Sequence, residues 1–135
     1  MIIIRSCNLI ITLCQGSMRF IIDTGAEKTQ INEIEAERIG LEFSSLDQSP
    51  KPVGTVAGLI SAKQLNDVIL IFKTHTGSTT ELALDNLLVT SRPKGRGKHV
   101  LRQIPNLLGR DLLIKYKVRL VADFGITESY MELKK

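Results

Sequence analysis

The sequence predicts a single domain over residues 1–135 that is mainly β, with one or two short helices. The chain is long enough for one domain with a substantial core, and neither a linker nor a low-complexity tract divides it. Its apolar residues are chiefly Ile, Leu and Val, and many fall in short runs, which favours strands. Trp is absent and aromatic residues make up 4% of the chain, so we expect an aliphatic core.

The first third of the chain is expected to hold three strands and a helix. The strands are expected at residues 9–13, 18–22 and 29–31. Asn32 and Glu35 match a capping box, in which a polar cap residue is followed three residues later by an acid. This pattern predicts a helix over residues 32–39, and Gly40 is a suitable residue to end it.

Further strands are expected in the second half of the chain. Their predicted positions are residues 68–72, 79–84, 87–89, 118–124 and 129–133. The first two form a hairpin about residues 75–78, where Gly77 suits a turn. Residues 104–108 are a short apolar strand that runs into Gly109, and residues 111–116 follow as a short helix. Strand, glycine and helix therefore occur twice in the chain, which suggests two similar half-domains.

A carboxylate stands directly after one of the predicted strands. The apolar run Phe20 to Ile22 indicates a buried strand, and it ends in Asp23, Thr24 and Gly25. A carboxylate at such a position is costly to desolvate. Asp can bond to its own backbone in a turn, and Gly accepts a positive φ. The triplet is therefore either a turn cap or a carboxylate held in place for chemistry.

A glycine-bearing segment lies near the middle of the chain. Residues 53–62 are small and β-prone, and Gly54 and Gly58 punctuate them. Each glycine weakens packing in a strand while permitting unusual backbone angles. The segment is therefore expected to form a flexible hairpin, although an ordinary surface hairpin fits the same pattern.

The net charge of +4 is unevenly distributed. Half of the 18 Lys and Arg residues fall between Arg92 and Arg119, where Asp111 is the only acid. The basic loop at about 91–103 is interpreted mainly as solvated surface, and the alternative is a patch that attracts acidic peptides or nucleic acid. No aromatic residue lies among these basic residues before Tyr116, so base stacking is not indicated and no nucleic-acid partner is expected.

The sequence indicates neither a metal site nor a cofactor. Cys7 and Cys14 are expected to be apolar filler in neighbouring strands, and no CxxC pattern supports zinc. A disulfide between them is possible but no pattern supports it. His75 and His99 are isolated from each other and from other ligand residues.

The N-terminal apolar segment does not match a signal peptide. Its basic residue, Arg5, lies inside the apolar run rather than ahead of it, and no small-residue cleavage site follows cleanly. No apolar stretch reaches the length of a membrane span. We therefore expect a cytoplasmic protein without a membrane partner.

Three motifs together resemble the retroviral-type (retropepsin-like) aspartic proteases over about residues 9–124. They are Ile22 to Ala26 with Thr29 and Ile31, the hairpin at 53–62, and Asn106 to Asp111. Helix-forming residues 32–40 separate the first two motifs, a layout closer to the cellular and prokaryotic members than to the compact viral ones. The resemblance implies the acid-protease fold, a closed β barrel in one domain.

The resemblance also implies a reaction that needs two carboxylates sharing one proton. One carboxylate activates water as a general base, and the other donates a proton to the scissile carbonyl oxygen. The chain holds one Asp-Thr-Gly triplet, so the second carboxylate is expected from another copy in a C2 homodimer. The predicted function is an aspartic endopeptidase that hydrolyses extended peptides or unfolded proteins. The alternative is an inactive retropepsin-like domain that serves dimerisation or peptide binding.

The resemblance assigns roles to individual residues of the triplet and its neighbours. Asp23 is the acid and base, and the Thr24 hydroxyl bonds across the dyad. Gly25 leaves room for a substrate backbone and offers its carbonyl, and Ala26 lines the cleft.

Two further sets of residues follow from the same resemblance. The hairpin at about 52–64 is the expected flap, which closes over a bound peptide through backbone bonding. Its substrate-binding residues are expected to be Val56, Ala57, Gly58, Leu59 and Ile60. Glu27 and Arg110 are expected to form a structural ion pair near the edge of the dimer, and two separate surface charges are the alternative.

Overall fold

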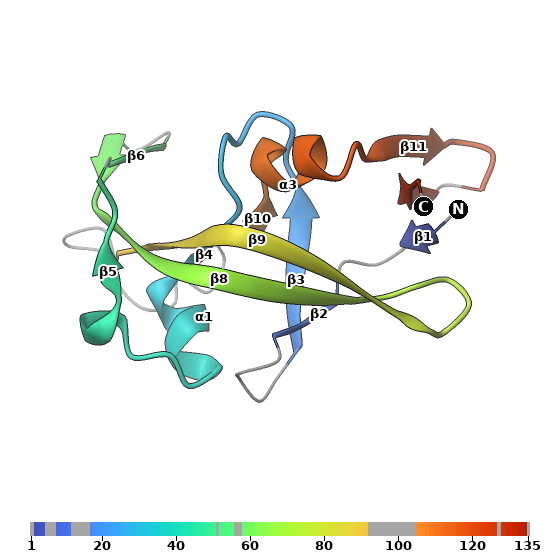
Figure 1. The fold of residues 1–135 in the computed structure, drawn as a ribbon. Helices are drawn as coiled ribbons and strands as arrows, with labels where there is room; N and C mark the ends of the chain where they lie inside the picture. Colours follow the sequence, from blue (N-terminus) through green and yellow to red (C-terminus); the bar gives the residue numbers. More distant parts are fainter. Residues whose placement is uncertain are drawn as a thin grey trace.

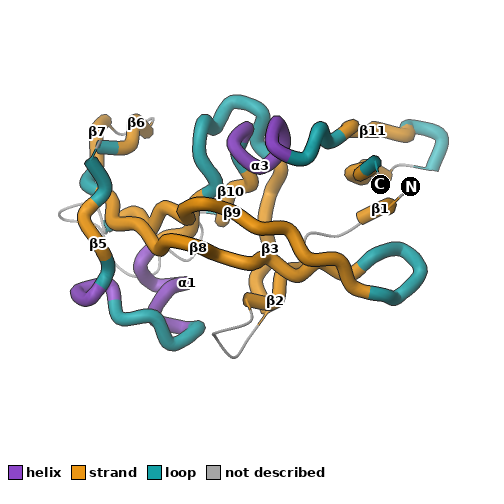
Figure 2. Tube along the Cα trace, in the orientation of Figure 1, coloured by secondary structure: helices purple, strands orange, loops and turns teal. Residues whose placement is uncertain are grey.

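A computed structural model describes residues 2–4, 8–11, 17–50, 52–55, 58–91, 105–126 and 128–134. It confirms a mainly β chain with two short α-helices in this part (Figures 1 and 2). The strands are β1 (Ile2–Ile4), β2 (Asn8–Ile11), β3 (Ser17–Ile22), β4 (Gln30–Asn32), β5 (Asp47–Gln48), β6 (Val53–Thr55), β7 (Gly58–Ile60), β8 (Ala62–Lys73), β9 (Thr79–Thr90), β10 (Asn106–Leu108), β11 (Arg119–Asp123) and β12 (Glu128–Leu133). The helices are α1 (Glu33–Arg38), α3 (Arg110–Lys115) and a 3-10 turn, η1 (Phe43–Ser45).

The largest sheet brings the two strand–glycine motifs together. Its strand order is β2-β3-β10-β4-β9-β8-β5, and β2 pairs with β8 as well as with β3. Strands β3 and β10 run parallel, with Phe20 opposite Asn106 and Ile22 opposite Leu108. Because both strands end at the same edge of the sheet, the loops that follow them start side by side.

Strands β8 and β9 form a long hairpin of 12 residues each. The sequence predicts the shorter strands 68–72 and 79–84, because polar residues interrupt both apolar runs. The structure places these interruptions opposite each other, with Asn66 facing Asn86 in the ladder. The core side of the hairpin continues beyond them, since Leu87 and Val89 are also buried.

The helix α1 forms where the capping box predicts it. The Asn32 side chain is the N-cap, and its Oδ1 accepts a hydrogen bond from the Glu35 backbone N–H at 2.9 Å. Gly40 has a φ of 87°, a conformation that glycine adopts without strain, and the helix ends just before it. Ala36 and Ile39 are buried against the core, so one face of the helix covers the sheet.

Two smaller sheets lie at opposite ends of the molecule. The hairpin of β6 and β7 lies at one end, and the sheet β1-β12-β11 lies at the other (Figures 1 and 2). Between them is one continuous core of aliphatic side chains with Phe20 and Phe72. Within the residues described here, no helix is long and apolar enough to span a membrane.

Candidate active site

The Asp23 carboxylate lies at the end of β3 in a tight turn. The Asp23 backbone N–H donates to the Leu108 carbonyl at 3.0 Å, so the turn begins from the β3–β10 pair. The Gly25 N–H donates to Asp23 Oδ1 at 2.8 Å, and the Ala26 N–H donates to the Asp23 carbonyl at 3.2 Å. No hydrogen bond from the described residues reaches Asp23 Oδ2. One carboxylate oxygen is thus held and the other is open.

The predicted residues 23–26 occupy one loop between β3 and β4. Thr24 and Gly25 are exposed, whereas Asp23 and Ala26 are half-buried. Within the described part of this chain the Thr24 hydroxyl has no hydrogen-bond partner, which leaves it available to another molecule. A Cβ on Gly25 would lie 3.1 Å from Asp23 Oδ1, so a side chain there would press on the carboxylate.

The far end of this loop is tied to the second glycine motif. Thr29 is fully buried, and its N–H and Oγ1 both donate to Asp111 Oδ1, at 2.9 and 2.7 Å. The Gly109 N–H donates to Thr29 Oγ1 at 3.0 Å. A Cβ on Gly109 would lie 2.4 Å from the Lys28 carbonyl carbon. Only glycine therefore allows the backbone at position 109 to lie this close to the backbone of Lys28. The first turn of α3 therefore holds the loop in place.

The pairing of Thr29 with Asp111 was not predicted from the sequence. Both residues belong to the motifs that carry the resemblance, but neither was assigned a role. One feature of the sequence could have indicated this contact. A hydroxyl residue follows the Asp loop, and an acid stands in the first turn of the later helix, where a carboxylate is favoured. The two residues lie 82 positions apart in the chain, so no local pattern joins them.

Glu27 and Arg110 lie on adjoining segments, and backbone hydrogen bonds join those segments. The Arg110 N–H donates to the Ala26 carbonyl at 2.8 Å, and the Asp111 N–H donates to the Glu27 carbonyl at 3.1 Å. Both side chains are exposed, and no ion pair joins them in the described part of the chain. An ion pair between exposed side chains contributes little to stability in water, so little free energy favours its formation in the single chain.

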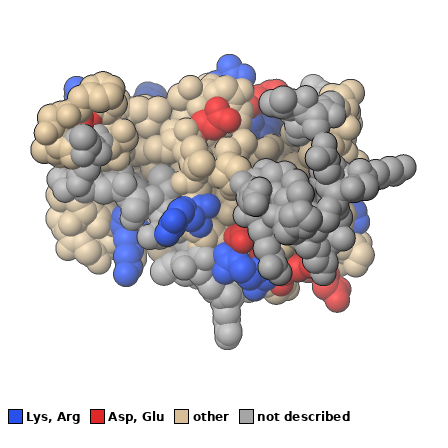
Figure 3. Space-filling view, turned by 180° about the vertical axis from the view of Figure 1, so that it is seen from behind, with Lys and Arg blue, Asp and Glu red and all other residues tan. Residues whose placement is uncertain are grey.

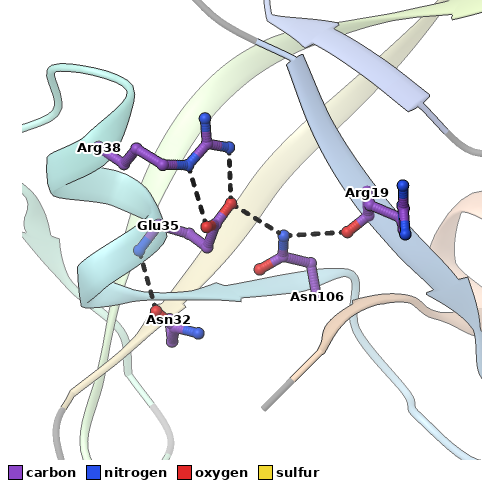
Figure 4. Close-up of polar contacts among 5 residues, drawn as sticks. All are labelled: Arg19, Asn32, Glu35, Arg38 and Asn106. Carbon is purple, nitrogen blue, oxygen red and sulfur yellow. Dashed lines mark hydrogen bonds and ion pairs between the residues drawn. The ribbon is translucent and has the colours of Figure 1, made fainter. Parts of the chain in front are cut away.

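A polar network behind the site connects β3, β10 and α1 (Figure 4). Asn106 is 4% exposed, and its Nδ2 donates to the Arg19 carbonyl at 3.1 Å and to Glu35 Oε2 at 3.3 Å. Arg38 donates two hydrogen bonds to the Glu35 carboxylate, at 3.0 and 2.8 Å. The Arg38 bonds lower the pKa of Glu35; burial opposes this shift and the Asn106 amide adds to it. The network holds β3, the strand that ends before Asp23, against β10 and α1.

The predicted flap segment contains a two-stranded hairpin. Strands β6 and β7 pair antiparallel, with Val53 opposite Ile60 and Gly54 opposite Leu59. Leu59 is 74% exposed, as expected for a hairpin that makes few contacts in the single chain. Ala62 already begins β8, so the end of the predicted range 52–64 belongs to the large sheet. Val56 and Ala57 lie outside the described residues.

Three other sequence features bear on the choice of site. Both cysteines lie outside the described residues. Of the basic loop at 91–103, only Ser91 is described. On the face shown in Figure 3, described Lys and Arg side chains are scattered among acidic ones rather than gathered in one patch. Among the described residues no three His, Cys, Asp or Glu side chains gather as metal ligands would.

The structure also contains a surface pocket away from the Asp23 loop. It measures about 450 Å³ and lies between α1 and η1. Its lining includes Glu33, Glu37 and Glu42 beside Leu41 and Phe43, and none of the predicted site residues. The lining also includes Ser44 but no His, Cys, Lys or Arg side chain, and it contains no residue of the two strand–glycine motifs, so the Asp23 loop is the better candidate site.

The chain has a retropepsin-like fold, as two solved structures show. It is similar to EIAV protease complexed with the inhibitor HBY-793, with a TM-score of 0.54 and 19% identity over 87% of this chain and 92% of that chain. It is also similar to the retroviral protease-like domain of Ddi1 from Leishmania major, with a TM-score of 0.56 and 15% identity over 98% of this chain and 94% of that chain. No protein-family model and no curated protein sequence matches the chain.

Proposed function

We propose that the chain is an aspartic-type endopeptidase that hydrolyses peptide bonds in extended peptides or unfolded proteins. The observation that carries the proposal is the Asp23 carboxylate at the end of β3, with Oδ1 held by the Gly25 N–H and Oδ2 without a hydrogen bond from the described residues. Its place in a retropepsin-like fold supports the assignment. The pairing of β2 with both β3 and β8 supports the closed barrel that such a fold implies.

The proposed reaction uses two Asp23 carboxylates, one from each copy of a homodimer. Two carboxylates at close range hold one proton between them, because both cannot ionise together. The ionised carboxylate takes a proton from water as the water oxygen attacks the scissile carbonyl carbon. The protonated carboxyl donates to the carbonyl oxygen, which gives a tetrahedral diol. The carboxyl that took the proton from water then protonates the leaving nitrogen as the C–N bond breaks, and a diol hydroxyl returns one proton to the other carboxylate. No cofactor takes part.

The neighbouring residues serve this reaction in the proposed dimer. The Thr24 hydroxyl, which has no hydrogen-bond partner among the described residues, bonds across the dyad. Gly25 and Ala26 line the substrate cleft, and residues 56–60 close over the peptide. Glu27 and Arg110 form their ion pair only in the dimer, where loss of surrounding water strengthens it. The adjoining backbone segments of these two residues support this arrangement.

The test compares the wild-type chain with Asp23→Asn on denatured protein substrates from acid to neutral pH. We expect cleavage to be lost in the variant, because an amide cannot act as the general base. Asp67→Asn is the matched control: Asp67 is exposed, lies outside the site and has a φ of 54°, which Asn tolerates. Equal cleavage by wild type and Asp23→Asn contradicts the proposal. A wild-type dimer that binds peptide without cleaving it supports the inactive peptide-binding alternative.

A further inference from the structure

The pocket between α1 and η1 is formed where the chain reverses its direction after the helix. Gly40 has a φ of 87°, and the Leu41 N–H donates to the Ala36 carbonyl at 2.8 Å, so the segment that follows the helix folds back towards it. The pocket measures about 450 Å³, which lies in the range of pockets that hold small ligands. It therefore has room for an amino-acid side chain of another molecule.

Apolar side chains form the walls of this pocket. Leu41 and Phe43 line it, and both are half-buried and packed against the core. Lys63 on β8, which is not part of the lining, contacts this wall. Its Nζ donates to the Ser44 carbonyl at 3.3 Å and lies 4.8 Å from the centre of the Phe43 ring. The aromatic ring is thus held in place before a ligand arrives.

Two carboxylates at the pocket have no partner among the described residues. Glu37 and Glu42 line the pocket and are exposed, and their side chains form neither a hydrogen bond nor an ion pair within the described part of the chain. The lining contains no Lys, Arg or His side chain. The pocket is therefore negative in a chain whose net charge is +4, so it attracts cations that the rest of the chain repels.

Apolar walls beside unpaired carboxylates fit the side chain of arginine. Its methylene stem contacts apolar surface while its charged end reaches a carboxylate. The planar guanidinium forms two parallel hydrogen bonds with a carboxylate and stacks on aromatic rings, whereas the ammonium of lysine is a point charge. Glu37, Glu42 and Phe43 supply both kinds of contact in one pocket.

The pocket lies at the same end of the molecule as the predicted flap. Strand β5 joins η1 to the β6–β7 hairpin, and in Figures 1 and 2 α1, β5 and this hairpin follow one another along one end. An unfolded polypeptide that is held under the hairpin is long enough to reach the pocket as well, since each extended residue adds about 3.3–3.6 Å.

We propose that this pocket is a second binding site of the enzyme, which takes an arginine of the polypeptide substrate away from the scissile bond. The inference rests on the proposed function for its substrate and adds the class of that substrate, a polypeptide in which arginine lies beside apolar residues. When one polypeptide occupies both sites, its affinity rises without a change in the chemical step.

The first test measures binding without cleavage, in the Asp23→Asn chain. The probe is a short fluorescein-labelled peptide of Gly, Leu and Arg, and fluorescence anisotropy gives its affinity. Glu37→Gln combined with Glu42→Gln should weaken binding about tenfold, because two charged contacts are lost. The matched control, Asp67→Asn with Glu81→Gln, removes the same charge from exposed positions on β8 and β9. It should change the affinity less than about twofold, because salt screens distant charges.

Two outcomes of this first test contradict the inference. Equal weakening by the pocket pair and by the control pair shows that only the overall charge matters. Unchanged binding in the pocket pair shows that the peptide is held elsewhere, for instance in the cleft beside position 23. Circular dichroism confirms that each variant is folded.

Changes of the probe test the chemistry of the ligand. A peptide with Gln in place of every Arg should not bind at the pocket, and one with Lys should bind more weakly, because an ammonium neither stacks on Phe43 nor bonds a carboxylate through two donors. Free arginine and spermidine are measured in the same way. If either binds as tightly as the peptide, the pocket takes a small cation and the inference is wrong. Equal binding of the Gln peptide contradicts it too.

The second test measures cleavage of two denatured proteins, one rich and one poor in arginine. Glu37→Gln with Glu42→Gln should raise KM for the arginine-rich substrate about threefold or more and leave its kcat unchanged, since the reacting groups are intact. KM for the arginine-poor substrate should stay as in wild type. A loss confined to kcat, or an equal rise of KM for both substrates, contradicts the proposed role.

These results separate the pocket from the enzymatic proposal. If the peptide binds through Glu37 and Glu42 while wild type cleaves nothing, the pocket binds arginine-containing polypeptides as inferred and the protease assignment fails. If cleavage depends on Asp23 while the pocket pair keeps the KM and the peptide affinity of wild type, the enzyme stands and the pocket inference fails.

Discussion

At the residue scale, the hydrogen bond from Gly25 to Asp23 reconciles two interpretations of one triplet. The sequence left Asp23 as either a turn cap or a carboxylate held for chemistry. In the structure Oδ1 closes the turn, and Oδ2 receives no hydrogen bond from the part of the chain that is described. The same side chain therefore caps the turn and keeps an oxygen that is suited to catalysis. The capping bond fixes the carboxylate direction, which a catalytic group requires before substrate arrives.

The close approach of Gly109 to Lys28 gives a prediction at the same scale. In Gly109→Ala the added methyl group would lie 2.4 Å from a backbone carbonyl carbon, and backbone cannot move aside as a flexible side chain can. We expect a loss of about 3 kcal/mol or more in the free energy of unfolding, from overpacking. Urea denaturation followed by circular dichroism measures it.

Gly54→Ala is the matched control for that substitution. The nearest atom to a Cβ on Gly54 is Leu59 Cδ2 at 3.9 Å, an ordinary contact, so stability should change by less than about 1 kcal/mol. If Gly109→Ala proves as stable as Gly54→Ala, the first turn of α3 does not hold the Asp23 loop as described.

At the scale of elements, local patterns predicted α1 and the short strands well. The capping box at Asn32 needs only neighbouring residues, and the helix begins where the pattern predicts. The extent of β8 and β9 was underestimated, because the ladder between the two strands continues through their polar residues, with Asn66 opposite Asn86. Single-strand periodicity carries no information on a partner strand, and this limits such predictions.

The pair of Glu35 with Arg38 on α1 predicts a pH dependence of stability. Hydrogen bonds from Arg38 lower the pKa of Glu35 below its ordinary value of 4.5. A carboxyl whose pKa is lower in the folded state stabilises the fold above its unfolded pKa, and this contribution disappears as the pH falls through the folded pKa. Wild type should thus exceed Glu35→Gln in unfolding free energy above pH 4.5 by about 1 kcal/mol at most, since the pair is partly exposed.

The measurement is chemical denaturation of both chains at a series of pH values from neutral to strongly acidic. The difference between the two chains should shrink towards zero below the folded pKa of Glu35. Glu37→Gln is the control for loss of one carboxylate from α1, because Glu37 is exposed and forms no ion pair among the described residues. A difference between wild type and Glu35→Gln that stays constant with pH contradicts the role of the ionised carboxylate.

At the scale of the whole molecule, the retropepsin-like fold could be predicted because paired motifs define it. The Asp-Thr-Gly triplet alone is compatible with an ordinary turn, and the second glycine motif makes it specific. What could not be predicted are the contacts that join the motifs, such as Thr29 with Asp111 and Asn106 with Glu35. These contacts depend on the parallel pairing of β3 with β10, which no local pattern encodes.

A shared active site predicts that a dimer of one active and one inactive copy has no activity. When wild type is mixed with an equal amount of Asp23→Asn, random pairing places half of the wild-type chains in mixed dimers. Cleavage by a fixed amount of wild type should then fall to about half. A rate assay after equilibration of the two chains measures this.

The control replaces Asp23→Asn in the mixture with an equal amount of Asp67→Asn, an exposed substitution outside the site. Cleavage should not fall in that mixture, because the mixed dimers keep both Asp23 carboxylates. Cleavage that is unaffected by Asp23→Asn in excess shows that each chain acts alone and contradicts the shared site.

The parallel pairing of β3 with β10 also has a consequence for how the chain folds. The bonds that fix the Asp23 loop join residues 82 positions apart, so the chain must close a long loop before the loop has its final shape. Long-range parallel pairing of this kind is slow compared with the formation of helices and hairpins. We therefore expect the hairpin of β8 and β9 to form early and the carboxylate to be positioned late. During synthesis on the ribosome, we expect the Asp23 loop to acquire its structure only after residues 106–112 have emerged.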